Sequence, residues 1–190
     1  MQLRRPKKVL LYLQGNNFRG NMEIQEALLN RRSIRKYKNQ KISKENLDKI
    51  LKAAMYAPSA MNLQAWRFIV IDDKEILADT IKSIPYAEML RQSAAAIIVC
   101  GDSSVEKNES WLLQNCSAAI QNILLSAHGL GIGSCWIAIH GMDDIYRNIK
   151  AQFNLPDNIV PVSLISLGYP DEVVKTEERF NQDKIHFNKW

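Results

Sequence analysis

The sequence has few of the features that mark secreted or membrane proteins. Only three cysteines occur in 190 residues, and no two of them form a C-x-x-C pair. An odd number of thiols without that spacing is typical of a reducing compartment without structural disulfides, and it predicts a cytoplasmic protein. The longest apolar run, Ala94–Cys100, is far shorter than the roughly 20 residues that cross a bilayer. We therefore expect no membrane partner.

Metal ligands and protein nucleophiles are scarce as well. The histidines, His128, His140 and His186, lack metal-ligand spacing with the cysteines and with one another. No Ser-His-Asp, Cys-His or paired-carboxylate arrangement stands out. The sequence predicts ordinary core or surface roles for the histidines, no metal site and no catalytic side chain.

Net charge is absent from most of the chain. Residues 1–21 contain five of the 25 basic residues and no acidic one, which accounts for the formal charge of +5. The other 169 residues carry 20 basic and 20 acidic side chains, which argues against a nucleic-acid-binding surface. We expect residues 1–21 to be a basic extension, dispensable or disordered, without a secretory cleavage site. Residues 22–190 would form a single domain.

Apolar periodicity predicts five or six helices and four strands, without repeats. Helices are expected at Met22–Leu29, Lys44–Met55, Lys74–Ser83, Ala87–Gln92, Ser110–Gly129 and Asp143–Gln152. Strands are expected at Trp66–Ile71, Ala94–Cys100, Ser134–Ile139 and Ile159–Leu167. Because these elements do not alternate regularly, we predict an α+β domain with a small mixed sheet of four to five strands covered by helices. Pro161 predicts an edge or a start position in the last strand.

The expected helix at 110–129 has an apolar surface too wide for a helix that covers one face of a small sheet. It lies at the centre of the core or also packs on a second subunit, and we favour the dimer. The glycines of Gly129-x-Gly131-x-Gly133 follow this helix instead of a strand, which is the wrong context for a dinucleotide motif. We interpret them as a helix stop and a close-packed turn.

Two polar segments flank the helix expected at 44–55. The basic turn, residues 31–37, gathers guanidinium groups and a hydroxyl, which suit a phosphate, although surface arginines also cluster by chance. The amide loop, residues 58–64, carries Asn62 and Gln64 between a proline and a tryptophan. Each amide can donate and accept, which matches the pyrimidine edge of a flavin. A ligand with a phosphate and a polar heterocycle is the resulting hypothesis.

Together these motifs resemble those of the nitroreductase family of FMN-dependent oxidoreductases. The segments that carry the resemblance are Arg-Arg-Ser-Ile-Arg-x-Tyr (31–37), Ala-Pro-Ser-x-x-Asn-x-Gln-x-Trp-x-Phe (57–68), Gly-x-Gly-Ser-Cys-Trp-Ile (131–137), Leu-Gly-Tyr-Pro (167–170) and Ile-His-Phe-Asn-Lys-Trp (185–190). The resemblance extends over residues 22–190.

The resemblance implies a nitroreductase-like fold and a homodimer with a shared interface that binds two FMN molecules. One subunit would hold the phosphate and ring edge through Arg31, Arg32, Ser33, Arg35 and Arg179. The partner subunit would approach the same flavin through Pro58, Ser59, Asn62 and Gln64. The remaining contacts, mainly through the backbone, would come from Ser134, Trp136 and Ile137.

The activity that the resemblance implies is ping-pong hydride transfer through FMN N5. NADH or NADPH would deliver the hydride, and a small-molecule acceptor (a nitroaromatic, a quinone or a free flavin) would then be reduced. Two alternatives stay open: a specialised relative, such as a flavin-dependent dehalogenase or a flavin-consuming enzyme, and a flavin-binding storage or sensor protein. The chain departs from the family at Ala65, often a proline, and at residues 138–141, where many members have Gly-Gly or Glu-Gly. The acceptor itself is therefore not implied.

Overall fold

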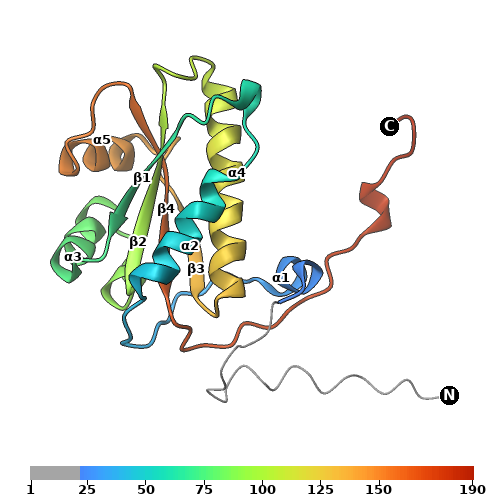
Figure 1. Ribbon diagram of the computed structural model, residues 1–190, viewed down its shortest axis with the longest axis horizontal. Coiled ribbons are helices and arrows are strands. Elements are labelled where there is room, and N and C mark those ends of the chain that lie inside the picture. The colour runs from blue at the N-terminus through green and yellow to red at the C-terminus, as the bar shows by residue number, and fades with distance from the viewer. Residues whose placement is uncertain (1–21) are drawn as a thin grey trace.

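The computed structural model describes residues 22–190, which form a four-stranded sheet with helices on both faces (Figure 1). The helices are α1 (Ile24–Asn30), α2 (Lys44–Met55), α3 (Lys74–Ser83), α4 (Glu109–Gly129) and α5 (Asp143–Gln152). The strands are β1 (Trp66–Ile71), β2 (Ala95–Asp102), β3 (Gly133–Ala138) and β4 (Ile159–Gly168). Short 3₁₀ turns lie at Ala60–Asn62 (η2), Glu88–Arg91 (η3) and Gln182–Lys184 (η4). The prediction for residues 1–21 lies outside the described residues.

The sheet has the strand order β1-β2-β4-β3, and every neighbouring pair is antiparallel. Within residues 22–190, parallel pairing occurs only as an isolated bridge between Ser33 and Ser134. The predicted α+β class, with a small sheet covered by helices, is confirmed. The four strands pair only antiparallel, so the sheet is antiparallel and not mixed as predicted; the parallel bridge joins β3 to Ser33, which lies outside the strands.

Two apolar cores lie on the two faces of the sheet. Alternate residues of β2 point to opposite sides, so that Ile97 and Val99 pack against α2 and α4 while Ile98 and Cys100 pack against α3 and α5. Figure 1 shows the same two layers, with α2 and α4 on one side of the strands and α3 and α5 on the other. Because β2 is buried on both faces, its sequence is a continuous apolar run.

Local capping explains why the helix limits could be predicted. The Ser43 hydroxyl accepts a hydrogen bond from Asn46 N–H, which starts α2 at Lys44. The Asp73 carboxylate accepts from the N–H groups of Glu75 and Ile76 and starts α3 in the same way. α2, α3, α5 and β1 have the predicted limits, and the other strands and α-helices differ by one or two residues at one or both ends. The helix predicted at Ala87–Gln92 is the short 3₁₀ turn η3.

α4 lies at the centre of the fold. Its buried residues are Leu112, Asn115, Cys116, Ala119, Ile120, Ile123, Leu124 and Ala127, and they contact both α2 and the sheet. This arrangement accounts for the wide apolar surface of α4 without a second subunit. The dimer therefore stays a prediction. After the helix ends, Gly131 adopts a φ of +72°, a conformation that favours glycine, so the predicted helix stop is confirmed.

Of the two positions predicted for Pro161, the edge strand is wrong, because β4 lies between β2 and β3, whereas the proline does lie near the start of β4, as its third residue. The proline is tolerated because the register between β2 and β4 shifts there: Val99 faces Ser163, whereas Cys100 faces Pro161. β3 pairs with β4 only from Ser163 onwards, so no strand needs a donor from Pro161 on that side. Proline is found in central strands at such bulges.

Residues 171–190 lead away from the body, as Figure 1 shows in red. They contain only the short turn η4 and expose large apolar side chains such as Phe180 and Phe187. None of the helices in residues 22–190 has the length and apolar character needed to cross a membrane.

Candidate functional site

The basic turn is held firmly over the end of the sheet where β3 begins. Ile34 N–H donates to the carbonyl oxygen of Ser134 at 2.9 Å. Tyr37 is buried, and its hydroxyl donates to the carbonyl oxygen of Ile34 at 2.5 Å. A Cβ on Gly168 would approach the Tyr37 ring to 2.7 Å, so the glycine is what lets the ring lie on β4. The backbone of the turn is therefore set by the sheet.

Positive charge gathers at this turn. Burial, and then the neighbouring Arg32 and Arg179, lower the pKa of Arg31 below its usual value. Arg179 of the tail therefore lies close enough to Arg31 to lower its pKa, and its role in binding FMN stays a prediction. Arg35 is exposed, whereas the guanidinium of Arg32 donates to the carbonyl oxygens of Leu29 and Arg31 at the end of α1.

A carboxylate from the tail completes the turn. Oε1 of Glu172 accepts from the backbone N–H of Arg35 at 2.5 Å and of Lys36 at 3.0 Å. Lys36 returns a bond through its carbonyl oxygen, which accepts from Asp171 N–H. The first residues of the tail are therefore fixed to the basic turn before the chain leaves the body.

The donor set of this turn fits an anionic group such as the phosphate of FMN. Ser134 is 1% exposed, and its Oγ is buried without a hydrogen-bond partner within residues 22–190. Ser134 lies directly beneath Ser33, with which it forms the parallel bridge. Unpaired hydroxyl and clustered guanidinium groups are stabilised by an anion that accepts from them. Arg31, Ser33, Arg35, Ser134 and Arg179 are the residues that could supply those donors.

The amide loop has a strained backbone. Met61, Asn62 and Gln64 have φ values of 51°, 56° and 51°, in the left-handed region that side chains other than glycine rarely adopt. Gln64 N–H donates to the Ser59 hydroxyl at 3.1 Å, and Gln64 Nε2 donates to Asn62 Oδ1 at 3.2 Å. Strain of this kind persists where surrounding contacts impose it, and it concentrates at ligand-binding sites.

α4 supplies one of the contacts that hold this loop. Oδ1 of Asn115, a buried residue, accepts from Ala60 N–H at 2.9 Å. Ala65, which stands where the family often has proline, is fully buried and its carbonyl oxygen accepts from Asp102 N–H. The loop is thus anchored at both ends without a proline at position 65.

The two predicted halves of the site lie at opposite ends of α4 (Figure 1). The amide loop is bonded to Asn115 near the start of the helix. The basic turn lies at the other end, where burial, and then Arg31, lower the pKa of His128 in the last turn. Thirteen residues separate Asn115 from His128, which corresponds to about 20 Å along the helix axis. A single chain therefore does not bring its basic turn and its amide loop together.

β3 supplies the remaining predicted residues. Trp136 lies on the α4 side of the sheet, and its indole N–H donates to Ser163 Oγ at 2.6 Å. Trp136 is 40% exposed, so part of it offers an apolar surface two residues along β3 from Ser134. The side chain of Ile137 is buried in the opposite core, with α3 and α5. Any contact of Ile137 with a ligand would have to come from its backbone, and this stays a prediction.

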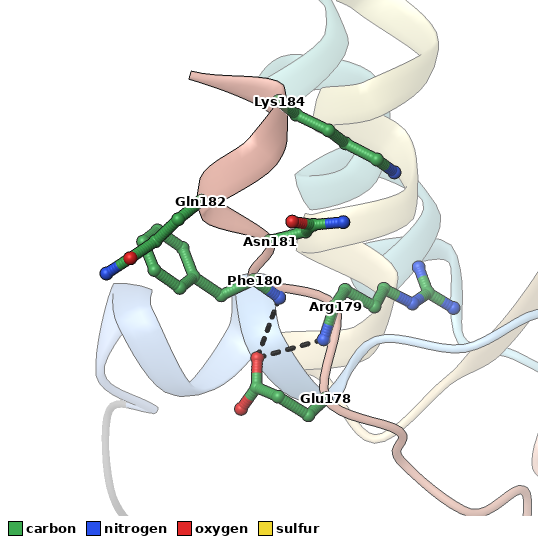
Figure 2. Close-up of a pocket in the computed structure, with 6 residues that line it drawn as sticks. All are labelled: Glu178, Arg179, Phe180, Asn181, Gln182 and Lys184. Atoms are coloured by element: carbon green, nitrogen blue, oxygen red, sulfur yellow. Dashed lines mark hydrogen bonds between the residues drawn. The ribbon is translucent and has the colours of Figure 1, made fainter. Parts of the chain in front are cut away.

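A separate hollow of about 810 Å³ lies within the tail itself. Figure 2 shows the Glu178 carboxylate accepting from the backbone N–H groups of Arg179 and Phe180, while the side chains of Arg179 and Lys184 extend to the same side. All six residues that line it belong to the tail: Glu178, Arg179, Phe180, Asn181, Gln182 and Lys184. It is a feature of an exposed segment, separate from β3 and the amide loop.

Comparison with known proteins identifies the family. The sequence profile of the nitroreductase family matches residues 28–96 and 85–169, more than half of the chain. A protein of Methanothermobacter thermautotrophicus, provisionally named NADH dehydrogenase/NAD(P)H nitroreductase, is 42% identical over 183 residues, covering 96% of this chain and 95% of its own. The chain belongs to the nitroreductase family.

Solved structures of nitroreductases have the same fold. An FMN-dependent nitroreductase from Clostridium difficile superposes with a TM-score of 0.80 at 38% identity, covering 86% of this chain and 98% of its own. A provisionally named nitroreductase from Desulfovibrio desulfuricans, solved in complex with FMN, has a TM-score of 0.74 at 28% identity over 90% of this chain and 99% of its own. The nitroreductase-like fold predicted from the sequence is confirmed.

The sequence does not predict the roles of three residues around the site. Tyr37 holds the basic turn on β4, Asn115 anchors the amide loop, and Glu172 anchors the tail. An amide within the apolar stripe of α4 could have pointed to Asn115. The sequence carries no local signal for Glu172, because its partners precede it by more than 130 residues. The nitroreductase profile ends at residue 169, so a role for Arg179 rests on its proximity to Arg31.

Proposed function

We propose that this nitroreductase-family chain is an FMN-dependent NAD(P)H oxidoreductase that works as a homodimer and reduces nitroaromatics, quinones or free flavins. The observation that carries the proposal is the separation of the basic turn and the amide loop by most of the length of α4. Each half suits one end of FMN, and neither is sufficient alone. Two copies related by a two-fold axis could combine the basic turn of one subunit with the amide loop of the other.

The chain's own residues would bind and orient the cofactor. The phosphate would be held by the basic turn, with Arg31, Arg32, Ser33 and Arg35, by Arg179 and by Ser134. One nitrogen of Arg32 already donates to the end of α1, and its Nε is buried without a partner within residues 22–190. The pyrimidine edge would be held by the partner's amide loop, with Pro58, Ser59, Asn62 and Gln64. Within that loop Gln64 and Asn62 already bond to each other, which leaves a carbonyl on one and an N–H₂ group on the other to pair with the ring.

When bound, FMN would supply the hydride chemistry, accepting a hydride at N5 from NADH or NADPH and passing it to the acceptor in ping-pong order. The protein would position the cofactor: the basic turn would hold the phosphate and the strained amide loop would hold the ring edge. The exposed part of Trp136 would lie near the ring. No side chain is required to act as a base or a nucleophile.

Exposed apolar side chains support the dimer. Ile24 and Leu29 of α1 are 69% and 66% exposed, and Met61 of the amide loop is 83% exposed. Together with the apolar residues of the tail they form surface that a second copy would remove from water.

The three cysteines are buried free thiols, which agrees with a reducing compartment, and a cytoplasmic location stays a prediction.

Anaerobic mixing of the purified full-length protein with NADH and with NADPH, followed by flavin absorbance, tests the proposal. We expect the absorbance of bound FMN to fall when NADH or NADPH is mixed in, because the flavin is reduced. The absorbance should recover when a quinone or a nitroarene is added. Protein that lacks flavin, and gains no NAD(P)H oxidation when FMN is added, would contradict it. Bound FMN that NAD(P)H does not reduce would indicate a storage or sensor protein. Rapid reduction with poor turnover of quinones and nitro compounds would indicate a specialised relative.

A matched pair of variants tests the basic turn. Arg35→Ala removes a guanidinium group from the proposed phosphate site, whereas Lys41→Ala removes the same charge from an exposed position after the turn. We expect Arg35→Ala to lower FMN affinity about tenfold or more, because charge-assisted bonds to phosphate are strong. Equal FMN retention in both variants would remove Arg35 from the site.

A further inference from the structure

The start of the tail runs alongside the basic turn before the chain leaves the body. Lys38 N–H donates to the carbonyl oxygen of Tyr169 at 2.8 Å. Asp171 N–H donates to the carbonyl oxygen of Lys36 at 2.9 Å. The direction of the tail at this point is therefore set by backbone pairing with the turn.

Glu172 extends this pairing by one side chain. Its Oε1 atom accepts from the N–H groups of both Arg35 and Lys36. Bonds from N–H groups to a carboxylate are charge-assisted, and they are stronger than bonds between neutral groups. Glu172 is only partly exposed, whereas every residue after it, 173–190, is exposed. The carboxylate is thus placed where the held part of the tail ends.

These bonds decide which donors of the basic turn remain for a ligand. The N–H of Ile34 is taken by Ser134, and the N–H groups of Arg35 and Lys36 are taken by Glu172. An anion at the turn would therefore be held mainly by side chains. Because the guanidinium of Arg35 projects from this backbone, its direction depends on the contact with Glu172.

The tail arm, residues 172–179, connects this anchor to a second point near the turn. Burial lowers the pKa of Arg31, and the positive charge of Arg179 lowers it further, which places Arg179 near the turn. The Glu178 carboxylate accepts from the N–H groups of Arg179 and of the next residue, so the backbone that carries Arg179 is also fixed (Figure 2). Seven residues span at most about 25 Å. The start of so short an arm limits where its end can lie.

We infer that Glu172 is a positioning residue for the FMN phosphate, because it anchors the tail arm that delivers Arg179. The inference rests on the proposed function and deepens it by naming a residue that acts without touching the cofactor. A group on a short tether has a high effective concentration near its target, and freeing the tether lowers it. The carboxylate also repels a nearby phosphate, so the anchoring has to outweigh that repulsion.

The first test does not require FMN. Amide hydrogen exchange at residues 35–36 of the purified full-length protein is followed by mass spectrometry. We expect about tenfold or faster exchange in Glu172→Ala, because both N–H groups lose their acceptor. Glu172→Gln keeps an acceptor oxygen without the charge and should lie between this variant and wild type. Glu177→Ala removes an exposed acid of the same arm and should match wild type. Equal exchange in Glu172→Ala and Glu177→Ala would overturn the inference.

The second test measures the dissociation constant of FMN by diluting the purified holoprotein and recording the fluorescence of released flavin. Glu172→Ala and Arg179→Ala should each raise the constant about tenfold or more. The double variant should raise it by much less than the product of the two effects, because an arm without its anchor has already lost most of the benefit of Arg179. Glu177→Ala should retain FMN as wild type does.

The results that contradict the inference differ from those that contradict the proposed function. Single effects that multiply fully in the double variant would overturn the inference, because Glu172 would then act independently of the arm. FMN binding in Glu172→Ala that equals wild type would also overturn it. Tighter binding would do the same, by showing that the carboxylate competes with the phosphate. Wild-type protein that holds no FMN would instead contradict the proposed function, whatever the exchange experiment shows.

Discussion

The hydroxyl of Tyr37 lies 2.8 Å from Oγ of Ser166 and donates to the carbonyl oxygen of Ile34. The first contact joins the basic turn to β4, and the second closes the turn on itself. Burial raises the pKa of Tyr37, so the hydroxyl keeps its proton under all ordinary conditions. One buried side chain thus connects the proposed phosphate site to the centre of the sheet.

Tyr37→Phe should therefore lower stability and FMN retention together. The substitution leaves the Ile34 carbonyl and the Ser166 hydroxyl without their buried partner, which costs about 1–3 kcal/mol of unfolding free energy. Urea denaturation measures the loss, and flavin absorbance after gel filtration measures retention. Tyr56→Phe is the control, because Tyr56 is 77% exposed, and its effect should stay within about 0.5 kcal/mol. Equal stability of the two variants would contradict the role of Tyr37.

Gly133→Ala tests the close contact between the basic turn and β3. A Cβ at position 133 would lie 2.9 Å from Cβ of Ile34, so the turn must move away from the strand. We expect a loss of about 1–3 kcal/mol, as for other overpacked sites, with weaker FMN binding. Gly129→Ala is the matched control, since nothing lies within 4 Å of its added Cβ and the residue ends α4. It should be neutral or stabilising; a similar loss in both variants would exclude steric crowding as the cause.

Asp102 predicts a specific dependence of stability on pH. Hydrogen bonds from the Ser104 hydroxyl and the Asn158 amide, opposed by partial burial, hold the pKa of this carboxyl below its usual value, and Arg67 adds an ion pair. A carboxyl whose pKa is lowered by folding contributes stability that is present above its unfolded pKa, near 4, and is lost as the pH falls through the folded pKa. Asp102→Asn should be about 1–3 kcal/mol less stable than wild type at pH 7. The difference should shrink below pH about 4.

The measurement for Asp102 is urea unfolding of both proteins between pH 3 and pH 7. Asp48→Asn serves as the control, because Asp48 forms an exposed ion pair with Lys44 one helical turn away. Pairs of that kind contribute little, so this variant should follow the wild-type curve closely. A constant difference between wild type and Asp102→Asn over the whole range would contradict the proposed linkage.

Complementation between subunits tests whether two chains share each site. Arg35→Ala and Asn62→Ala should each weaken FMN binding as homodimers. When the two variants are co-expressed, each mixed dimer contains one site with an intact basic turn and an intact amide loop, so about a quarter of all sites should recover. FMN content and NAD(P)H oxidation of the co-purified protein measure the recovery.

The control for complementation pairs two defects in the same half-site. Co-expression of Arg35→Ala with Ser33→Ala leaves a defective basic turn in every site, and we expect no recovery. If this pair recovered as well as the first, the defects would not be separated between subunits. If neither pair recovered, both halves would have to come from one chain, which the length of α4 argues against.

Most of the secondary structure could be predicted because its causes are local. α2 begins after the Ser43 cap, α3 begins after the Asp73 cap, and β2 is apolar throughout because it is buried on both faces. Such signals act between residues close in sequence, so they can be recognised without knowledge of the fold. The same is true of the basic turn and the amide loop, whose residue types predict their chemistry.

Long-range pairing could not be predicted in the same way. The missing N–H of Pro161 predicts an edge or a start position, and it does not reveal that the irregular register opposite Val99 and Cys100 accommodates the proline near the start of a central strand. Glu172 reaches the backbone of Arg35 across more than 130 residues, and Asn115 reaches Ala60 across 55. No periodicity in the sequence marks either contact.

The sequence by itself determined which residues this protein offers to a ligand: guanidinium and hydroxyl groups in one segment, amides in another. Only the tertiary structure decided where they lie, at opposite ends of a central helix about 30 Å long. The physical reason is that residue type is a local property, whereas the distance between two segments depends on how α4 packs on the sheet and on α2. That packing separates the two halves within one chain, so that under the proposed function a second copy of the chain would bring them together.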